Sequence, residues 1–172
     1  GKPSLTNSTF SGNSATSSGG AVYAKDTNVT LNNSTISNNS ATAVGGIVAG
    51  GATVNLENSI VANSIGDNCT AVEGALINAS STLSNDTTCG GATDTDPLLG
   101  PLADNGGATL THALMRGSPA IDAALGASAT TSDQRGVEAQ GVRDIGAFEY
   151  VEEPSVFFTV PLPNGKVITI SL

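Results

Sequence analysis

The sequence predicts an all-β protein, a right-handed single-stranded parallel β-helix with three short strands in each coil of about 25 residues. A repeat of that length, a composition rich in small polar residues, and regular Gly and Asn turns together predict this fold. Ser, Thr and Asn make up close to a third of the chain, whereas aromatic residues are 3% and charged residues 12%. This composition excludes a long amphipathic-helix protein and a β-sandwich filled with aromatic side chains.

A leucine followed two residues later by asparagine begins each expected coil. The segment occurs at 5–10, 31–36 and 56–61, with a weaker fourth copy at 83–85. The leading leucines are therefore 26, 25 and 27 residues apart, close to one turn of a three-stranded solenoid. We expect apolar side chains to stack inside the solenoid. We expect the asparagines to form an amide ladder, each side chain bonding to its equivalent one coil away: Asn7, Asn33, Asn58 and Asn85.

Two further β-prone runs recur in phase with the leucine segment. One begins with glycines and occurs at 19–23 and 45–48, with 74–77 as its third copy. The other, at 28–30 and 53–55, leads directly into the next leucine. Each coil thus holds three strands separated by turn residues. A leucine-rich repeat, the main alternative, requires more leucine than these coils contain.

The two cysteines, Cys69 and Cys89, lie 20 residues apart. That separation nearly returns the chain to the same side of the solenoid, so it predicts a disulfide. Two buried free thiols are the alternative. A disulfide favours an extracellular or cell-surface location, because such bonds persist in oxidising compartments. No metal site is expected, since the single histidine, His112, lacks a CxxC or HxxxH companion.

The chain is acidic, with a formal net charge of −9 and six Lys and Arg residues. Without a basic patch or a series of stacking aromatics, nucleic acid is not expected as a partner. The sequence contains no apolar stretch of the roughly 18 to 20 residues that span a bilayer, so we expect no membrane span. The missing initiator Met predicts a processed product or an excised domain.

Beyond Cys89 the repeat fades and a series of specific motifs follows. The series reads Asp-Pro-Leu-Leu-Gly-Pro-Leu at 96–102, Gly-Ser-Pro-Ala-Ile-Asp at 117–122 and Arg-Asp-Ile-Gly-Ala-Phe-Glu-Tyr at 143–150. It resembles the carboxyl-terminal part of the choice-of-anchor Q domain, found in bacterial secreted and surface proteins of the right-handed parallel β-helix family. The resemblance covers about residues 5–150. It implies a secreted or surface-displayed bacterial protein, and it implies no particular activity.

Residues 1–150 are therefore expected to form a parallel β-helix with a closing cap, and 151–172 a separate tail. We expect the cap to lie over the end of the solenoid. Ser118 as N-cap before a proline predicts a short helix near 119–124. Arg135 and Arg143 lie among carboxylates, so we expect them to pair acidic side chains and backbone carbonyls.

Parallel β-helices also include polysaccharide lyases and hydrolases, which need charge stabilisers or paired carboxylates. The candidates here are Asp94, Asp96 and Asp104 with Arg116, Arg135 or Arg143. The early coils carry few charges and lack sugar-stacking aromatics, so we expect no enzyme, no catalytic residue and no cofactor. His112 has no nucleophile-elbow motif beside it, which favours a structural role over a Ser–His–Asp triad. Weak calcium binding by the three aspartates stays open, because Asp-Gly turns explain them equally well.

The tail contains two β-prone runs, 156–162 and 166–172, on either side of Asn164-Gly165. That dipeptide predicts a hairpin in which Leu162 faces Val167 and Thr159 faces Ile170. Both faces would then be apolar and would need cover. We expect the following tail residues to mediate assembly: Val156, Phe157, Phe158, Val160, Leu162, Val167, Ile168, Ile170 and Leu172.

The sequence thus favours a non-catalytic extracellular bacterial structural or adhesive surface protein that assembles head to tail into a fibre through its tail. The expected partner is a second copy of the chain, and surface glycans are a further candidate. A tail folded back on its own subunit is the alternative to assembly. A polysaccharide-acting lyase or hydrolase, or a glycan-binding module, is the alternative function.

Overall fold

The computed structural model describes residues 1–126, 130–152, 157–161 and 167–171, the last two ranges as strands without their side chains. The described residues contain strands and turns but no helix, so the all-β prediction is confirmed. None of the described segments therefore forms a helix of the length and hydrophobicity needed to cross a bilayer.

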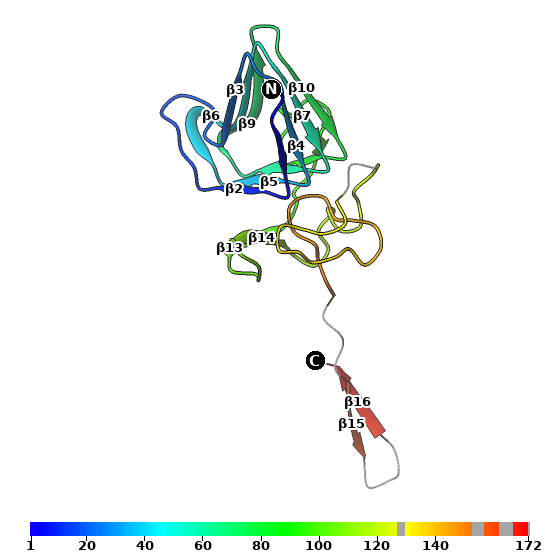
Figure 1. Cartoon of the computed structure of the whole chain (residues 1–172). Helices are drawn as coiled ribbons and strands as arrows, with labels where there is room; N and C mark the ends of the chain where they lie inside the picture. The colour runs from blue at the N-terminus through cyan, green and yellow to red at the C-terminus, as the bar shows by residue number, and fades with distance from the viewer. Residues whose placement is uncertain (127–129, 153–156, 162–166, 172) are drawn as a thin grey trace.

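Twelve short strands build a parallel solenoid, as the repeat predicts (Figure 1). They form three parallel sheets, seen nearly end-on in Figure 1 as three sides of a triangle. Sheet 1 contains β1 (Ser4–Thr6), β4 (Val29–Asn32), β7 (Thr53–Glu57) and β10 (Leu76–Ser80). Sheet 2 contains β2 (Thr9–Ser11), β5 (Thr35–Ser37), β8 (Ile60–Ala62), β11 (Leu83–Ser84) and β12 (Thr93–Asp94). Sheet 3 contains β3 (Val22–Lys25), β6 (Ser40–Gly50) and β9 (Ile65–Val72).

The strand register confirms the first three leucine segments and corrects the fourth. Leu5 pairs with Leu31 and Leu31 with Leu56, but the next residue in the column is Ala79. Leu83 pairs instead with Ile60 in sheet 2. The last coil is therefore 23 residues long, shorter than the predicted 27. The glycine run predicted as a third copy at 74–77 likewise leads into β10 in sheet 1, not into sheet 3.

The glycine run in sheet 3 is required by close backbone packing between coils. A Cβ atom on Gly46 would lie 2.0 Å from the carbonyl oxygen of Asn68 in the next coil. A Cβ atom on Gly20 would lie 2.4 Å from the carbonyl oxygen of Ser40. Any side chain at these positions would push the coils apart, which explains why the sequence repeats glycine there.

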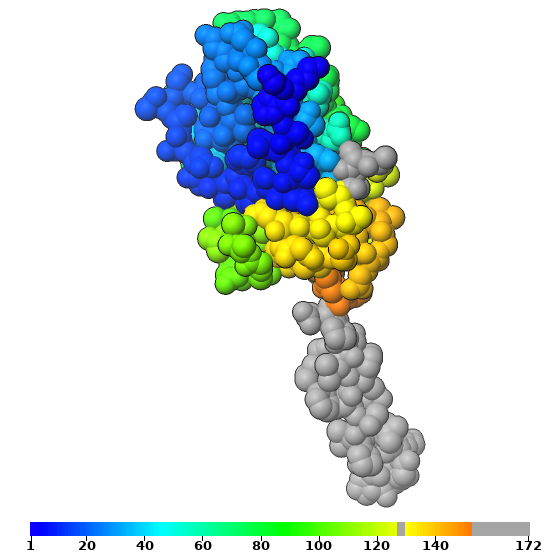
Figure 2. Space-filling view, viewed as in Figure 1, coloured from blue at the N-terminus to red at the C-terminus, as the bar shows by residue number. Residues whose placement is uncertain are grey.

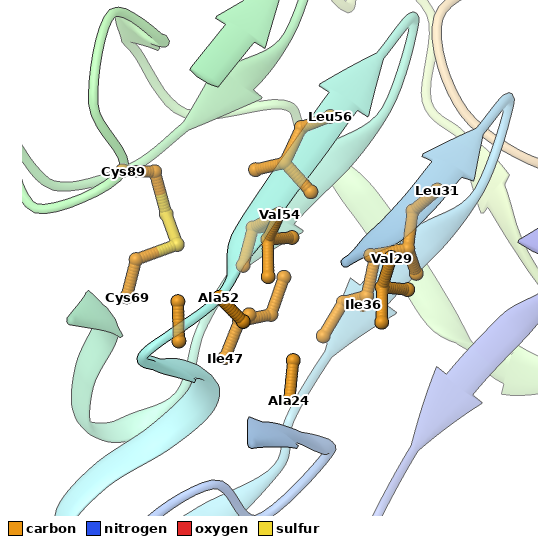
Figure 3. Close-up of a cluster of buried hydrophobic side chains, with 12 residues drawn as sticks. Ala24, Val29, Leu31, Ile36, Ile47, Ala52, Val54, Leu56, Cys69 and Cys89 are labelled. Atoms are coloured by element: carbon orange, nitrogen blue, oxygen red, sulfur yellow. A yellow bond between two sulfur atoms is a disulfide. The ribbon is translucent and has the colours of Figure 1, made fainter. Parts of the chain in front are cut away.

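The inward side chains of successive coils form one apolar core (Figure 3). Leu31, Ile36, Ile47, Val54 and Leu56 are fully buried in it. Burying side chains of this size stabilises the fold by roughly 1.5 to 3 kcal/mol each. At the edge of this core, the predicted disulfide is confirmed: Cys69 and Cys89 are bonded, with their Cα atoms 4.9 Å apart.

The cap, residues 96–150, lies against the side of the solenoid and not over its end (Figures 1 and 2). Its described regular structure is the antiparallel pair β13 (Leu99–Ala103) and β14 (Thr111–Leu114), and the rest of its described part is turns and loops. Ile60 and Leu83, on the outer face of sheet 2, form a second apolar cluster with cap residues, among them Ile145 and Phe148. The predicted position of the cap is corrected because these outward apolar side chains require cover.

The helix predicted near 119–124 is also absent, and a turn occupies this stretch. The Ser118 carbonyl accepts a hydrogen bond from the Ile121 N–H at 3.2 Å, but Asp122 then adopts a left-handed φ of 54°. A helix cannot continue through that conformation. The Ser118 hydroxyl also donates to the carbonyl of Pro97 at 2.6 Å, which fixes the turn against the preceding loop.

In the tail, β15 (Phe157–Pro161) and β16 (Val167–Ser171) form the predicted antiparallel hairpin, one residue away from the predicted register. Phe158 pairs with Ile170 and Thr159 with Thr169. Opposite residues lie on the same face, so one face holds the positions of Phe158, Val160, Ile168 and Ile170, and the other face holds both threonines together with Phe157 and Val167. The predicted assembly residues Val156, Leu162 and Leu172 lie outside the described residues, as do the side chains of the remaining six.

We predict that Leu31→Ala lowers the free energy of unfolding by about 3 kcal/mol, because it leaves a cavity in the centre of the core. Leu5→Ala, at the matching position of the half-buried first coil, should cost about 1 kcal/mol. Urea unfolding followed by circular dichroism measures both. Equal losses would mean that the first coil is as well covered as the second.

Candidate functional site: the charged cap and the first-coil edge

Three asparagines end the strands of sheet 1 in the same backbone conformation. Asn7, Asn33 and Asn58 have φ angles of 48°, 45° and 46°, in the left-handed region that asparagine tolerates well. The next residue in this column is Ser81, with a φ of 43°. The repeated asparagine therefore marks a repeated turn between sheets 1 and 2.

The predicted amide ladder is not formed, because the cap takes the Asn7 and Asn58 side chains as partners and the buried Asn33 amide bonds to neither of them. Asn7 Nδ2 donates to the carbonyl of Ser132 at 2.8 Å, and Asn58 Oδ1 accepts from the Leu125 N–H at 2.9 Å. Asn85 lies outside the column, and its Nδ2 donates to Oδ1 of Asn63 at 2.9 Å. Among the described residues, no hydrogen bond joins two of the four predicted ladder side chains. This asparagine column thus attaches the cap to the solenoid, through Asn7 and Asn58.

Arg135 holds the cap loops together, as its acidic surroundings predict. Its Nε donates to Asp133 Oδ2 at 2.7 Å, and its terminal nitrogens donate to the carbonyls of Asn105 and Glu149 at 3.1 and 2.6 Å. The guanidinium carbon also lies 3.6 Å from the centre of the Phe148 ring, a cation–π contact. One planar side chain thus joins three segments of the cap.

Arg143 connects the buried acidic residues of the cap to the solenoid. Its Nη1 donates to Glu149 Oε2 at 3.0 Å, and its Nη2 donates to Asn7 Oδ1 at 3.3 Å. Asp144 accepts the N–H groups of Asp122 and Tyr150. Arg143, Asp144 and Glu149 are all buried. This inward arrangement confirms the predicted pairing of both arginines and leaves Arg143, Asp144 and Glu149 with only a few per cent of their surface exposed.

Burial and hydrogen bonds shift the acidic groups of the cap in opposite directions. Burial alone would raise the pKa of Asp133, but the N–H groups of Glu149 and Val137 and the Arg135 guanidinium lower this pKa below its ordinary value. Burial, together with the Asp122 charge, raises the pKa of Asp144 above its ordinary value, although its two N–H donors and Arg143 lower it. Burial and the neighbouring Asp144 charge likewise raise the pKa of Glu149, despite Arg143. Ionisation of Asp133 therefore stabilises the folded protein, whereas ionisation of Asp144 and Glu149 destabilises it.

His112 joins the cap to the first coil. Its Nδ1 lies 2.8 Å from the carbonyl oxygen of Gly100, so Nδ1 carries the proton and donates. Its Nε2 therefore accepts from the Ser11 hydroxyl, also at 2.8 Å. Serine and histidine are spaced as in a nucleophile–base pair, but a backbone carbonyl stands where a triad has a carboxylate. The buried ring, 1% exposed, connects β14 to β2 through hydrogen bonds.

The aspartates considered for catalysis or calcium occur in local turns. Asp96 Oδ1 accepts the Leu98 N–H at 2.9 Å, and Asp104 Oδ1 accepts the Gly106 N–H at 3.1 Å. Asp94 ends the two-residue strand β12. Within the described part of the chain, no three His, Cys, Asp or Glu side chains lie close enough together to hold a metal ion.

The first coil leaves the interior of the solenoid partly open. Strands β1, β2 and β3 each stand at the end of their sheet and pair only with the second coil. The inward side chains Leu5 and Phe10 are half-buried, whereas their register partners Leu31 and Ile36 are fully buried. The first-coil edge, defined as β1, β2 and β3, thus combines unpaired backbone groups with accessible apolar side chains.

The other end of the solenoid is crossed by the segment that carries Cys89. The Ala79 N–H donates to the carbonyl of Gly90 at 3.0 Å, and Thr88 Oγ1 accepts the Cys69 N–H at 2.9 Å. The disulfide fixes this segment to β9. The two ends of the solenoid are therefore unlike, and the first-coil edge is the more open one.

Sequence analysis missed a hollow on the outer face of sheet 3. The Tyr23 hollow is lined by residues of β3, β6, β9 and the loop before β3: Ser17, Ser18, Tyr23, Val48, Thr70 and Val72. The sequence feature that could have indicated this hollow is the alternation in β3, where Tyr23 lies between the inward residues Val22 and Ala24 and must therefore point outward. Without the strand register, that single aromatic residue could not be connected to the other coils.

Comparison with known proteins gives one short match. Residues 7–25 are similar to the Chlamydia polymorphic membrane protein repeat. The matched stretch contains β2 and β3 of the first coil, including the glycine turn between them. No curated protein and no solved structure matches the chain. The chain is thus a β-solenoid with a repeat similar to one from a family of surface membrane proteins.

We predict that Asp133→Asn lowers the free energy of unfolding at pH 7 by about 2 kcal/mol, because the ionised carboxylate accepts several hydrogen bonds and pairs with Arg135. The depressed pKa means that this contribution is lost as pH falls through the acidic range, so the two proteins should converge there. Urea unfolding between pH 7 and pH about 2 measures the difference. Asp104→Asn, at an exposed turn, is the matched control and should change little; a loss for Asp133→Asn that is independent of pH would contradict the argument.

We predict that Ser11→Ala lowers the free energy of unfolding by about 1 kcal/mol, because it leaves His112 Nε2 buried without its partner. Thermal unfolding measures this loss. The structural reading also predicts that a fluorophosphonate probe leaves Ser11 unmodified. Labelling that disappears in Ser11→Ala and in His112→Gln would instead establish an activated nucleophile.

Proposed function

We propose that the chain is a non-catalytic structural or adhesive module of a bacterial surface protein, and that it assembles head to tail through its C-terminal tail. In this proposal, the tail of one copy adds to the first-coil edge of the next. The observation that carries the proposal is the open first-coil edge, with its half-buried Leu5 and Phe10.

A location outside the cytoplasm is supported by two independent features. The disulfide between Cys69 and Cys89 is typical of an oxidising compartment. The first coil is similar to a repeat of a surface membrane protein family. The resemblance of residues 96–150 to the choice-of-anchor Q domain favours the same location in bacteria.

Assembly is supported by the chemistry of the first-coil edge. On either side of β1, the carbonyl of Pro3 and the N–H of Asn7 bond to β4. Backbone groups alternate along a strand, so those of Ser4 and Thr6 point to the unpaired side. Such an edge can pair with an added strand, and burial of the apolar side chains behind it would stabilise the complex.

The tail has the properties of a complementary element. Its register places Phe158, Val160, Ile168 and Ile170 on one face of the hairpin. A two-stranded hairpin is marginally stable in water, so this face needs a partner surface. Contacts between unlike surfaces repeat from copy to copy and produce a ring or a fibre.

A non-catalytic role is supported by where the charged side chains lie. Asp133 and Arg135 pair with each other inside the cap, and Arg143 pairs with Glu149. These groups satisfy the cap and do not face a substrate. Four of the six residues considered for a hydrolase or lyase thus have structural partners: Asp96, Asp104, Arg135 and Arg143. Turnover of polysaccharide that Arg135→Ala or Asp104→Ala abolishes would contradict this part of the proposal.

We predict that deleting residues 154–172, or combining Phe158→Asp with Ile170→Asp, yields a folded monomer. The charges would have to be buried against the first-coil edge, which strongly disfavours association. Light scattering during size-exclusion chromatography measures the mass, and circular dichroism checks that the β-structure is unchanged. Thr159→Asp with Thr169→Asp adds the same charge to the opposite face of the hairpin and should still assemble.

The first-coil edge has its own test. Thr6→Pro removes an N–H on the unpaired side of β1 without removing a hydrogen bond to β4. We expect it to block assembly as effectively as the tail variants. A wild-type chain that stays monomeric at high concentration would overturn the proposal and leave the tail as an intramolecular brace.

A further inference from the structure

We propose that the Tyr23 hollow binds one neutral pyranose ring of an oligosaccharide. This site lies on the outer face of sheet 3, away from the cap, and it does not depend on assembly through the tail. The proposal rests on an exposed aromatic ring, on three hydroxyl-bearing residues that line the hollow with it, and on Gly50, which has no side chain next to the tyrosine hydroxyl.

The strand register assembles the hollow from three coils. Tyr23, Val48 and Thr70 are register partners in β3, β6 and β9, so their side chains lie in one outward row. Gly50 and Val72 pair in the neighbouring outward row. The Tyr23 side chain is 54% exposed, whereas Val48 is 2% exposed. An outward valine can be that well buried only if neighbouring side chains cover it.

The tyrosine ring lies along the sheet between two glycines. A Cβ atom on Gly19 would lie 3.3 Å from Cδ2 of the ring, and a Cβ atom on Gly50 would lie 3.5 Å from the hydroxyl oxygen of Tyr23. The ring therefore extends from the loop before β3 to the end of β6. Because more than half of the Tyr23 surface is exposed, aromatic surface is available for stacking against an apolar ring face.

The hydroxyl groups beside the ring belong to ordered backbone. The Ser17 carbonyl accepts the Ala43 N–H at 3.0 Å, and Ser18 bridges to Val44 in parallel register. Thr70 lies within β9. Hydroxyls on fixed backbone can donate to and accept from ligand hydroxyls with little loss of entropy on binding.

The chemistry of the hollow selects a saccharide. A pyranose presents C–H groups on its faces and hydroxyls around its rim, which matches an aromatic face bordered by hydroxyl groups. The hollow of about 380 Å³ is at the small end of ligand sites, consistent with one ring. None of the six lining residues is charged, the Glu73 carboxylate lies beside Gly50 at the hydroxyl end of the Tyr23 ring, and the chain carries a net charge of −9. Long-range repulsion therefore disfavours uronic acids, phosphorylated sugars and nucleotides.

The test is a titration of the ¹⁵N-labelled protein, followed by NMR, with the full-length chain and with the chain lacking residues 154–172. The probes are tetrasaccharides of glucose and of N-acetylglucosamine, with tetragalacturonate as the anionic comparison. We expect shifts at the amides of Tyr23, Gly50 and Thr70 with a neutral probe, with Kd of about 1 mM, and none with the anionic one. Comparison of the two chains separates this site from assembly.

Three variants identify the site. Tyr23→Ala should weaken binding at least about tenfold, whereas Tyr23→Phe should retain it within about threefold, because the ring supplies the stacking contact. Gly50→Val places a branched side chain against the Tyr23 hydroxyl and Val72 at the edge of the hollow and should weaken binding, and it should fold, because Gly50 has no left-handed φ and its Cβ would make ordinary contacts. Leu76→Ala removes another exposed apolar side chain, on sheet 1, and should have no effect.

Each other outcome overturns the proposal. No shift at about 10 mM of either neutral probe, or shifts that persist in Tyr23→Ala and Gly50→Val, would exclude the hollow as a saccharide site. Tighter binding of tetragalacturonate would exclude the neutral assignment. Shifts at these amides that grow with protein concentration alone would assign the hollow to a second copy of the chain.

Discussion

The structure depends on one strand, β8, that must be buried on both faces. Ile60 and Val61 are neighbours whose side chains point to opposite sides of sheet 2, and both are fully buried. The solenoid interior covers Val61, but nothing within the coils can cover Ile60. The cap supplies that cover, so it packs against the side of the solenoid. The asparagine column, the Ser11–His112 pair and the arginine network all attach the cap at this surface.

The repeat could be predicted because the coil imposes the same environment at the same spacing. Leu5, Leu31 and Leu56 occupy one inward column, and sequence spacing alone identified them. Leu83 was assigned wrongly to this column, because a leucine that faces the cap cannot be distinguished in sequence from one that faces the core. The asparagines were located correctly, but their partners were not. A ladder and a cap contact both need a polar side chain at the same turn.

Local spacing also decided how much of the charged cap could be foreseen. Arg135 lies two residues from Asp133, and Arg143 six from Glu149, so pairing was evident from the sequence. The burial of Arg143 was not evident, since it follows from contact with a residue more than a hundred positions away, Asn7. The predicted helix failed for a related reason. The Ser118 hydroxyl has its closest partner in the Pro97 carbonyl, across a loop, and this contact favours the turn.

The lateral cap has a consequence for the ends of the solenoid. A cap placed over an end would protect unpaired strands, as terminal repeats commonly do in solenoids. Here the cap protects an outer face, and the last coil is closed instead by a short segment fixed through Cys69 and Cys89. The first-coil edge receives neither form of protection. Its strands are short, which limits uncontrolled pairing, but Leu5 and Phe10 still favour a covering surface. The fold therefore has a direction, with one open end and one closed end, and association through the open end would repeat in that direction.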